Sequence, residues 1–314
     1  MATRIVEPSV LRLAALARFV ILLFLGIPFV SSAQELEPRA YSNAPVGLNF
    51  LIAGYAYSEG GVVVDPSIPL DDAAINLHSE LVAYARSFSL GGKSAKFDLV
   101  GAYASLSGTA NFAGEPRQRD TSGWADPRLR IYVNLFGAPA LTLPQMQTYQ
   151  QDLIVGVSLQ IGAPLGRYEA DKLINLGSNR WSAKPEIGVT KAFGRWIAEF
   201  TAAAAFYSDN DNYFGGHERT QEPIYSAQGS MVYSFPSKMW VSFGATYYVG
   251  GRTSVDGVRG ADLKENTRFG VTLAVPVNRR NSIKFHASTG VATRTGSDFD
   301  TAGIAWQYRW GGGV

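Results

Sequence analysis

The chain contains no cysteine and comparatively few charged residues. None of its 314 residues is Cys, and Asp, Glu, Lys and Arg together make up 17%, below the ~25% of ordinary soluble proteins. The absence of Cys excludes a disulfide framework, a thiolate metal site and a cysteine nucleophile. The low charge content argues against a nucleic-acid-binding protein. The 33 Gly, 15 Tyr and 17 Phe instead suit a β-rich envelope protein.

Long apolar runs are confined to the N-terminus. Residues 19–30 are apolar apart from one Gly and one Pro, three Arg precede them, and small residues stand at positions −3 and −1 of a cut before Gln34. This order predicts a cleavable signal peptide over 1–33. The alternative, an uncleaved membrane helix, would need roughly 20 apolar residues. Removal of 1–33 leaves 25 basic and 25 acidic residues, and therefore a neutral chain.

From residue 47 onward, apolar residues recur with a period of two, as in a strand with one apolar face. Phe269, Val271 and Leu273, for example, are separated by single Gly and Thr residues. Twelve such segments, mostly 11–16 residues long, exceed the 5–6 residues of ordinary strands. The sequence therefore predicts an all-β fold, a transmembrane antiparallel β-barrel of about 12 strands; a soluble β-sandwich is the alternative. The segments are 47–58, 74–89, 94–107, 124–136, 150–164, 180–193, 196–208, 222–235, 239–250, 265–276, 282–295 and 300–310.

The connections alternate between short turns and long polar loops, which is the pattern of outer-membrane barrels with both termini in the periplasm. We expect an N-terminal periplasmic segment over 34–46, the barrel over 47–310 and a C-terminal tail over 311–314. Two features break the pattern. The connection 137–149 is long where a short turn belongs and is expected to hold a small periplasmic plug or helix. Pro185 lacks a ladder donor, so its strand is expected to be bulged or to begin late. The short turns are 90–93, 194–195, 236–238 and 277–281, and the long loops are 59–73, 108–123, 165–179, 209–221 and 251–264.

Aromatic residues gather at both predicted rims, as in the belts that flank the apolar band of a membrane barrel. The short-turn rim has Phe193, Trp196, Phe235, Trp240 and Trp310, and the long-loop rim has Trp181, Phe206, Tyr207, Tyr247 and Tyr248.

Charged residues fall on the face opposite the apolar one, where they would point into the barrel. Charges at membrane depth are costly unless they are paired or hydrated. Two interpretations follow: acids and bases pair and fill a narrow interior, or some of them line a pore and set its selectivity. The predicted lumen-lining residues of this set are Asp126, Arg128, Arg130, Lys184, Glu186, Glu199, Arg268, Lys284, His286 and Arg309.

Motifs for catalysis or metal binding are weak. The sequence contains no G-x-S-x-G, G-x-G-x-x-G, P-loop or H-E-x-x-H motif. His286 lies two residues before Ser288, but side chains at i and i+2 of a strand stand side by side. The run 209–212 opens like a calcium loop yet lacks the Gly and Glu that such a loop requires. We therefore expect no enzyme, no cofactor and no metal site.

Four segments, starting at Gly123, Asn175, Trp240 and Arg268, share a pattern with a known family. They resemble the outer-membrane proteins of the meta-cleavage phenol-degradation pathway, and the resemblance extends over most of 40–310. It implies a transporter-like β-barrel linked to uptake of aromatic compounds, and it assigns no catalytic residues. Unlike many such barrels, the chain continues past its last aromatic residue, Trp310, so its assembly signal is expected to be displaced or weak. The family-motif positions are Asn179, Arg180, Trp181, Gly250, Gly251 and Arg252.

The combined prediction is an outer-membrane channel that passes small, aromatic or hydrophobic molecules by passive diffusion. The alternative is a closed structural barrel, or one that binds through its loops without transport. The closed barrel would show a continuous run of salt bridges from Asp126 to Arg309. Expected partners are outer-membrane lipid, a small-molecule solute and the barrel-assembly machinery; nucleic acid is not expected.

Overall fold

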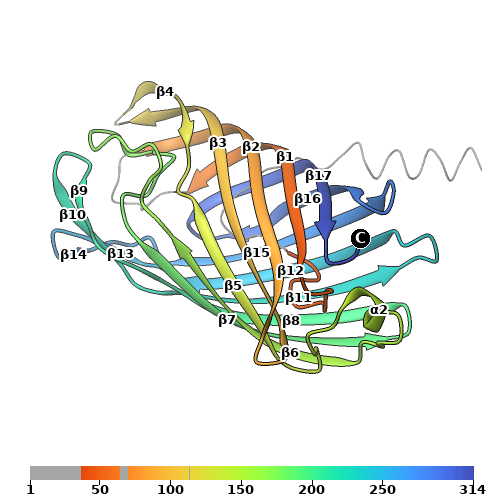
Figure 1. Cartoon of the computed structure of the whole chain (residues 1–314). Helices are drawn as coiled ribbons and strands as arrows, with labels where there is room; N and C mark the ends of the chain where they lie inside the picture. The colour runs from red at the N-terminus through yellow and green to blue at the C-terminus, as the bar shows by residue number, and fades with distance from the viewer. Residues whose placement is uncertain (1–36, 64–69, 113) are drawn as a thin grey trace, which may run out of the picture.

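The structure, a computed structural model, describes residues 37–63, 70–112 and 114–314. The expected signal peptide, 1–33, lies outside these residues. Twelve antiparallel strands close into a barrel, because each pairs with the barrel strand before it and β1 also pairs with β17 (Figure 1). Every predicted segment overlaps one of these strands, so the predicted barrel is confirmed. The strands are β1 (Leu48–Val63), β2 (Leu70–Leu90), β3 (Lys93–Phe112), β5 (Arg128–Phe136), β6 (Leu153–Gly162), β7 (Ser182–Phe193), β8 (Trp196–Tyr207), β11 (Ile224–Ser234), β12 (Trp240–Gly250), β15 (Lys264–Pro276), β16 (Asn281–Thr293) and β17 (Gly296–Gly311).

The long-loop end of the barrel is more ordered than expected. Strand β4 (Glu115–Trp124) pairs with the outer half of β3. Strands β9 (Asn210–Tyr213), β10 (His217–Gln221), β13 (Thr253–Val255) and β14 (Val258–Arg259) form a separate sheet. The segments 108–123, 209–221 and 251–264, predicted as long polar loops, therefore contain strands: the first pairs with β3, and the other two pair with each other.

The two faces of each strand differ as the alternation predicts. On β5, Leu129 and Ile131 are 42% and 45% exposed, whereas Arg130 and Tyr132 between them are 8% and 2% exposed. A closed sheet can pack side chains only on its inner face. The buried polar residues therefore face the interior, and the exposed apolar residues form a belt around the outside. Among the described residues, no helix is long and apolar enough to cross a bilayer.

The aromatic rims are only partly turned outward. Phe193, Trp196, Phe235 and Trp310 are exposed near the short turns, as are Trp181, Phe206 and Tyr247 near the loops. Trp240, Tyr207 and Tyr248 were expected in the same belts but lie on the inner face. The guanidinium groups of Arg39 and Arg180 lie over the rings of Trp240 and Tyr207. Asn266 Nδ2 donates to the buried Tyr248 hydroxyl at 2.9 Å. All three rings occupy the inward parity of their strands.

Pro185 does not disturb its strand, contrary to the prediction. Strand β7 begins at Ser182, before the proline, and Pro185 pairs with Leu159 in an unbroken register with β6. On the β8 side the register is the same before and after it, from Ala183–Phe206 to Glu186–Ala203. The missing N–H therefore interrupts the ladder without shifting it.

The connection 137–149 contains the short helix α2 (Leu143–Met146), in agreement with the prediction of a helix or plug there. The Thr142 backbone N–H donates to the Gln145 side chain at its start, at 2.8 Å. The connection also holds neighbouring segments: Val46 N–H donates to Leu141 O at 2.8 Å, and Ser94 N–H donates to Ala138 O at 3.0 Å. The chain is thereby anchored at the short-turn end immediately before β1 begins.

Candidate functional site

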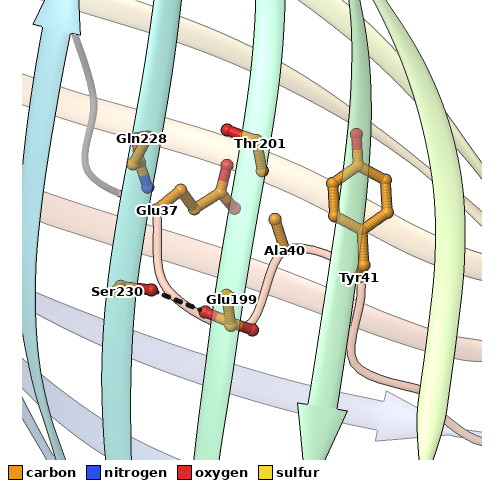
Figure 2. A pocket seen from close by; sticks show the side chains of 7 residues that line it. All are labelled: Glu37, Ala40, Tyr41, Glu199, Thr201, Gln228 and Ser230. Carbon is orange, nitrogen blue, oxygen red and sulfur yellow. Dashed lines mark hydrogen bonds between the residues drawn. The ribbon is translucent and has the colours of Figure 1, made fainter.

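Residues 37–46 lie inside the barrel. From Val46 at the short-turn end, the segment reaches inner-face residues of β5, β6, β7 and β8 through hydrogen bonds of Glu37, Arg39 and Tyr41. Figure 2 shows Glu37 and Ala40 beside strands β8 and β11. The sequence predicts a periplasmic segment over 34–46, ahead of the barrel. The described part of it, 37–46, contacts the inner wall of the barrel instead.

Tyr41 is held by the inner wall. Its hydroxyl donates to Glu186 Oε1 at 3.0 Å and lies 3.3 Å from Ser158 Oγ. Its ring rests on Gly156 and Gly188, where an added Cβ would lie less than 3.0 Å from ring atoms. Glycine inside a strand often marks a close approach of another group. The two glycines therefore form the slot that admits the ring.

Glu37, the first described residue of the segment, lies in a cluster of cationic side chains. Its carboxylate accepts a hydrogen bond from the Tyr132 hydroxyl at 3.0 Å and forms an ion pair with Arg130 at 3.2 Å. The positive charges of Lys96 and Lys284 also act on it. Lys96 Nζ lies 4.2 Å from the centre of the Tyr132 ring, a cation–π geometry.

Arg39 joins the segment to β8 and β12. Its backbone N–H donates to Glu199 Oε2 at 2.8 Å, and Ser230 Oγ donates to the same oxygen at 3.1 Å. Its guanidinium carbon lies 5.8 Å from the centre of the Trp240 ring, and Lys284 Nζ lies 6.0 Å from the same ring. Arg39 has φ +66°, so the chain makes a sharp turn at this residue.

Two cavities flank the segment. Each offers about 10 Å³ to the centre of a water-sized sphere, which is room for about one water molecule. The first is lined by Glu37, Ala40, Tyr41, Glu199, Thr201, Gln228 and Ser230 (Figure 2). The second is lined by Ala40, Ser42, Ala44, Ser87, Ser94, Ala95, Lys96, Tyr132 and Asn134.

The structure brings some of the predicted interior residues together around this segment. Arg130 and Lys284 surround Glu37, Glu186 receives Tyr41, and Glu199 receives Arg39. Lys184 forms an ion pair with Glu186 at 3.6 Å. These five residues share one region of the interior, between the segment and the wall.

Other predicted residues lie elsewhere. Arg268 is buried and donates to Phe299 O. His286 is exposed on the parity that faces the interior and lies beside Gly303 of β17, its cross-strand partner. Arg128 begins β5 and pairs with Val100 and Gly162.

The two ends of the salt-bridge run predicted for a closed barrel have other roles. Asp126 accepts hydrogen bonds from Gly166 N–H at 2.9 Å and Ser178 N–H at 2.8 Å, and so clamps the loop 165–179. Arg309 Nε donates to Arg279 O at 2.7 Å near the short turns. Among the described contacts, these two residues do not begin and end a ladder of ion pairs.

The family-motif residues meet at the loop end. Asn179 donates to Asn210 Oδ1 at 2.8 Å, and Arg180 donates to Gln221. Gln221 Nε2 in turn donates to Gly251 O at 3.0 Å. Burial lowers the pKa of Arg180 to about 10. The two parts of the motif, distant in sequence, are thus joined through one glutamine.

The rest of the motif shapes the backbone at this end. Gly250 and Gly251 have φ +110° and +65°, and an added Cβ on Gly250 would overlap Pro223 O. Arg252 O accepts a hydrogen bond from Glu222 N–H at 2.8 Å. Trp181 is among the exposed aromatic residues. The glycines therefore form a corner that other residues could not adopt without strain.

Sequence reasoning missed Glu37, Arg39 and Tyr41 as interior residues. Their segment is too short and irregular to show a period. The only signal was indirect, in the inward-facing Gly156 and Gly188 on adjacent strands.

In the part of the chain that the structure describes, no group of three or more His, Asp and Glu residues could hold a metal ion.

Comparisons with known proteins agree with this architecture. The structure is similar to that of an outer membrane channel from Pseudomonas putida F1, with a TM-score of 0.75 and 21% identity, covering 88% of this chain and all of that one. It also resembles the transport unit of the autotransporter AIDA-I from Escherichia coli, with a TM-score of 0.52 and 10% identity, over 88% of this chain and 93% of the other. No curated protein matches the sequence. Residues 56–308 match the family described as "Putative MetA-pathway of phenol degradation", and the chain belongs to that family.

Proposed function

We propose that the protein is an outer-membrane channel that passes small aromatic or hydrophobic molecules by passive diffusion. The observation that carries this proposal is the closed barrel with an exposed apolar belt outside and polar, partly charged residues inside. In such a barrel the backbone groups pair between strands, the apolar outer face contacts lipid and the polar inner face can be hydrated. The family and the similar channel from Pseudomonas putida F1 support the same function.

The interior residues Arg130, Lys184, Glu186, Glu199 and Lys284 are proposed to line the path of the solute. They place both signs of charge around the segment 37–46. A mixed lining of this kind is hydrated without forming a ring of one sign, so we expect weak selectivity for simple salts.

The second candidate is a closed barrel that binds through its loops. It is favoured by the segment 37–46, which occupies part of the interior. The two candidates differ in permeability and can be separated by one experiment.

Proteoliposomes in phenyl β-glucoside, an uncharged aromatic solute that crosses lipid slowly, test the channel directly. Swelling clearly faster than in protein-free vesicles supports a channel. Swelling at the background rate, with the protein folded and with 37–46 also deleted, would favour the closed barrel.

We further propose that residues 1–33 are removed before Gln34, that the barrel-assembly machinery inserts the chain and that both termini face the periplasm. The pairing of Leu48 with Gly311 supports the shared location of the ends. The turns at Gly91–Gly92 and Gly194–Arg195 directly precede the first residues of β3 and β8. Both turns are short, as periplasmic turns are. Mass spectrometry of the protein from outer membranes tests the cleavage position.

A further inference from the structure

We propose that the barrel interior contains a binding site for the carboxylate of a small aromatic solute, and that Glu37 of the chain itself occupies this site in the absence of solute. The proposal rests on the proposed channel function and names a substrate class for it. It also makes the segment 37–46 an internal competitor that the solute displaces.

The first argument is the excess of positive charge around Glu37. Arg130, Lys96 and Lys284 act on its carboxylate, and Arg39 of the same segment lies over the Trp240 ring that Lys284 also approaches. The nearby acids are Asp98, which faces Arg130 across the β3–β5 pair, and Glu199, which binds Arg39. When the segment is displaced, Arg39 leaves with Glu37, and three bases of the wall, Arg130, Lys96 and Lys284, then face two acids. This excess of positive charge favours another anion in the place of Glu37.

The second argument is the geometry of the donors. The Tyr132 hydroxyl donates a hydrogen bond to Glu37 Oε2 at 3.0 Å, and the Arg130 guanidinium forms an ion pair with the same oxygen at 3.2 Å. Arg130 and Tyr132 belong to the wall and are almost fully buried, whereas the Glu37 side chain is 41% exposed. The donors are thus built into the barrel, and the acceptor is a replaceable group on a non-covalently held segment. Charge-assisted hydrogen bonds of this kind recognise any carboxylate.

The third argument is the aromatic surroundings. The Tyr132 ring is flanked by Lys96, and the Trp240 ring by Lys284 and Arg39. Tyr41 meets Tyr132 edge to face, with ring centres 5.9 Å apart. Tyr41 leaves with the segment, so a planar ring carrying a carboxylate could pack against the Tyr132 ring in its place and direct its charge to the cations of the wall. The space beside Glu37 holds about one water molecule, so the ring of a solute has to take the place of the displaced segment.

The competition should occur at a solute concentration that is accessible to experiment. A ligand tethered by a short chain acts at an effective concentration in the millimolar range. Benzoate at roughly 10–100 mM is therefore expected to compete with Glu37. Benzyltrimethylammonium, of similar size and opposite charge, should not compete.

The absence of cysteine from the chain permits a direct test. In an Ala40→Cys variant the single thiol replaces a buried side chain of the segment. Its reaction with a membrane-impermeant maleimide reports displacement of 37–46 from the wall. We expect 50 mM sodium benzoate to accelerate labelling at least fivefold, and 50 mM benzyltrimethylammonium chloride to leave it within twofold of the rate in sodium chloride. Ser42→Cys, a nearly isosteric change, provides the same readout should Ala40→Cys fold poorly.

Two second-site variants show whether the cations are responsible. Lys284→Gln, added to the cysteine variant, should abolish the difference between benzoate and sodium chloride. Lys238→Gln, in the exposed turn between β11 and β12, is the matched control and should leave that difference intact. Equal acceleration by both organic ions, or no acceleration by benzoate, would overturn the carboxylate site.

The labelling assay does not depend on transport, so the two proposals can fail separately. Conductance in sodium chloride that stays at background in every variant would contradict the channel while the benzoate effect on labelling could still stand. Conductance without a benzoate effect would retain the channel and reject the carboxylate site.

Discussion

Gly188 of β7 and Tyr41 of the N-terminal segment are in such close contact that no other residue fits at position 188. An added Cβ would lie less than 3.0 Å from three atoms of the Tyr41 ring. The bare backbone of the strand is thus the surface on which the internal segment rests. The position of the segment depends on this contact as much as on its hydrogen bonds.

Gly188→Ala is therefore expected to expel the segment while leaving the barrel folded. Overpacking of a close contact costs about 1–3 kcal/mol, enough to raise the population of the displaced segment roughly tenfold. Single-channel conductance should increase accordingly. Gly229→Ala, on strand β11 where an added Cβ meets nothing within 4 Å, is the control and should conduct as the wild type does.

Tyr132→Phe removes the hydroxyl that donates to Glu37 and retains the ring. A hydrogen bond to a charged group contributes about 1.5–3 kcal/mol, so the segment should be released about tenfold more often. Maleimide labelling of the Ala40→Cys variant measures this release. Tyr103→Phe, on the exposed outer face, should not alter the labelling rate; equal rates in both variants would show that the hydroxyl does not hold the segment.

Asp126→Ala should loosen the loop 165–179 without opening the barrel. The carboxylate accepts hydrogen bonds from Gly166 and Ser178, and each lost bond leaves a donor that costs about 1–3 kcal/mol where it is buried. Faster hydrogen exchange confined to this loop is the expected result. The same change at the exposed Asp209 is the control. Unchanged exchange in the Asp126 variant would mean that other contacts hold the loop.

The sheet at the loop end should depend on pH through Asp256. Backbone N–H of Glu218 donates to its carboxylate at 2.9 Å and His217 contacts it at 2.6 Å, and these contacts hold the pKa of Asp256 below its ordinary value of 3.8. The stabilisation is therefore fully present above pH 3.8 and is lost as the pH falls through the lowered pKa. Hydrogen exchange at Glu218 should accelerate in that acidic range, and Asp256→Asn should remove this pH dependence. A wild-type rate that follows only the intrinsic chemistry of exchange would contradict the role of Asp256.

The barrel could be predicted from the sequence because every strand repeats the same period of two. The alternation along each strand also predicts which face an aromatic ring occupies, and its position near a rim does not. Trp240 shares its parity with Ser242 and Thr246, which are buried on the inner face, so its inward direction follows from the pattern of β12. A position near a rim does not decide which face a ring occupies.

The occupied interior could not be predicted in the same way. Glu37 and Arg130 meet only after five strands have brought the wall around the segment, and no local pattern encodes that distance. Hydrogen-bond pairing of β9, β10, β13 and β14 is equally non-local, since it depends on two loops arriving at the same side of the barrel. The sequence predicted the wall, and the fold determined what the wall encloses.

Single-channel recording in planar bilayers tests the central claim most directly, with purified wild-type protein and the Gly188→Ala variant measured side by side. A channel partly occupied by residues 37–46 should show discrete conductance steps in the wild type and larger or more frequent steps in the variant. Current at the level of the bare bilayer in both proteins, with both correctly folded, would contradict a channel.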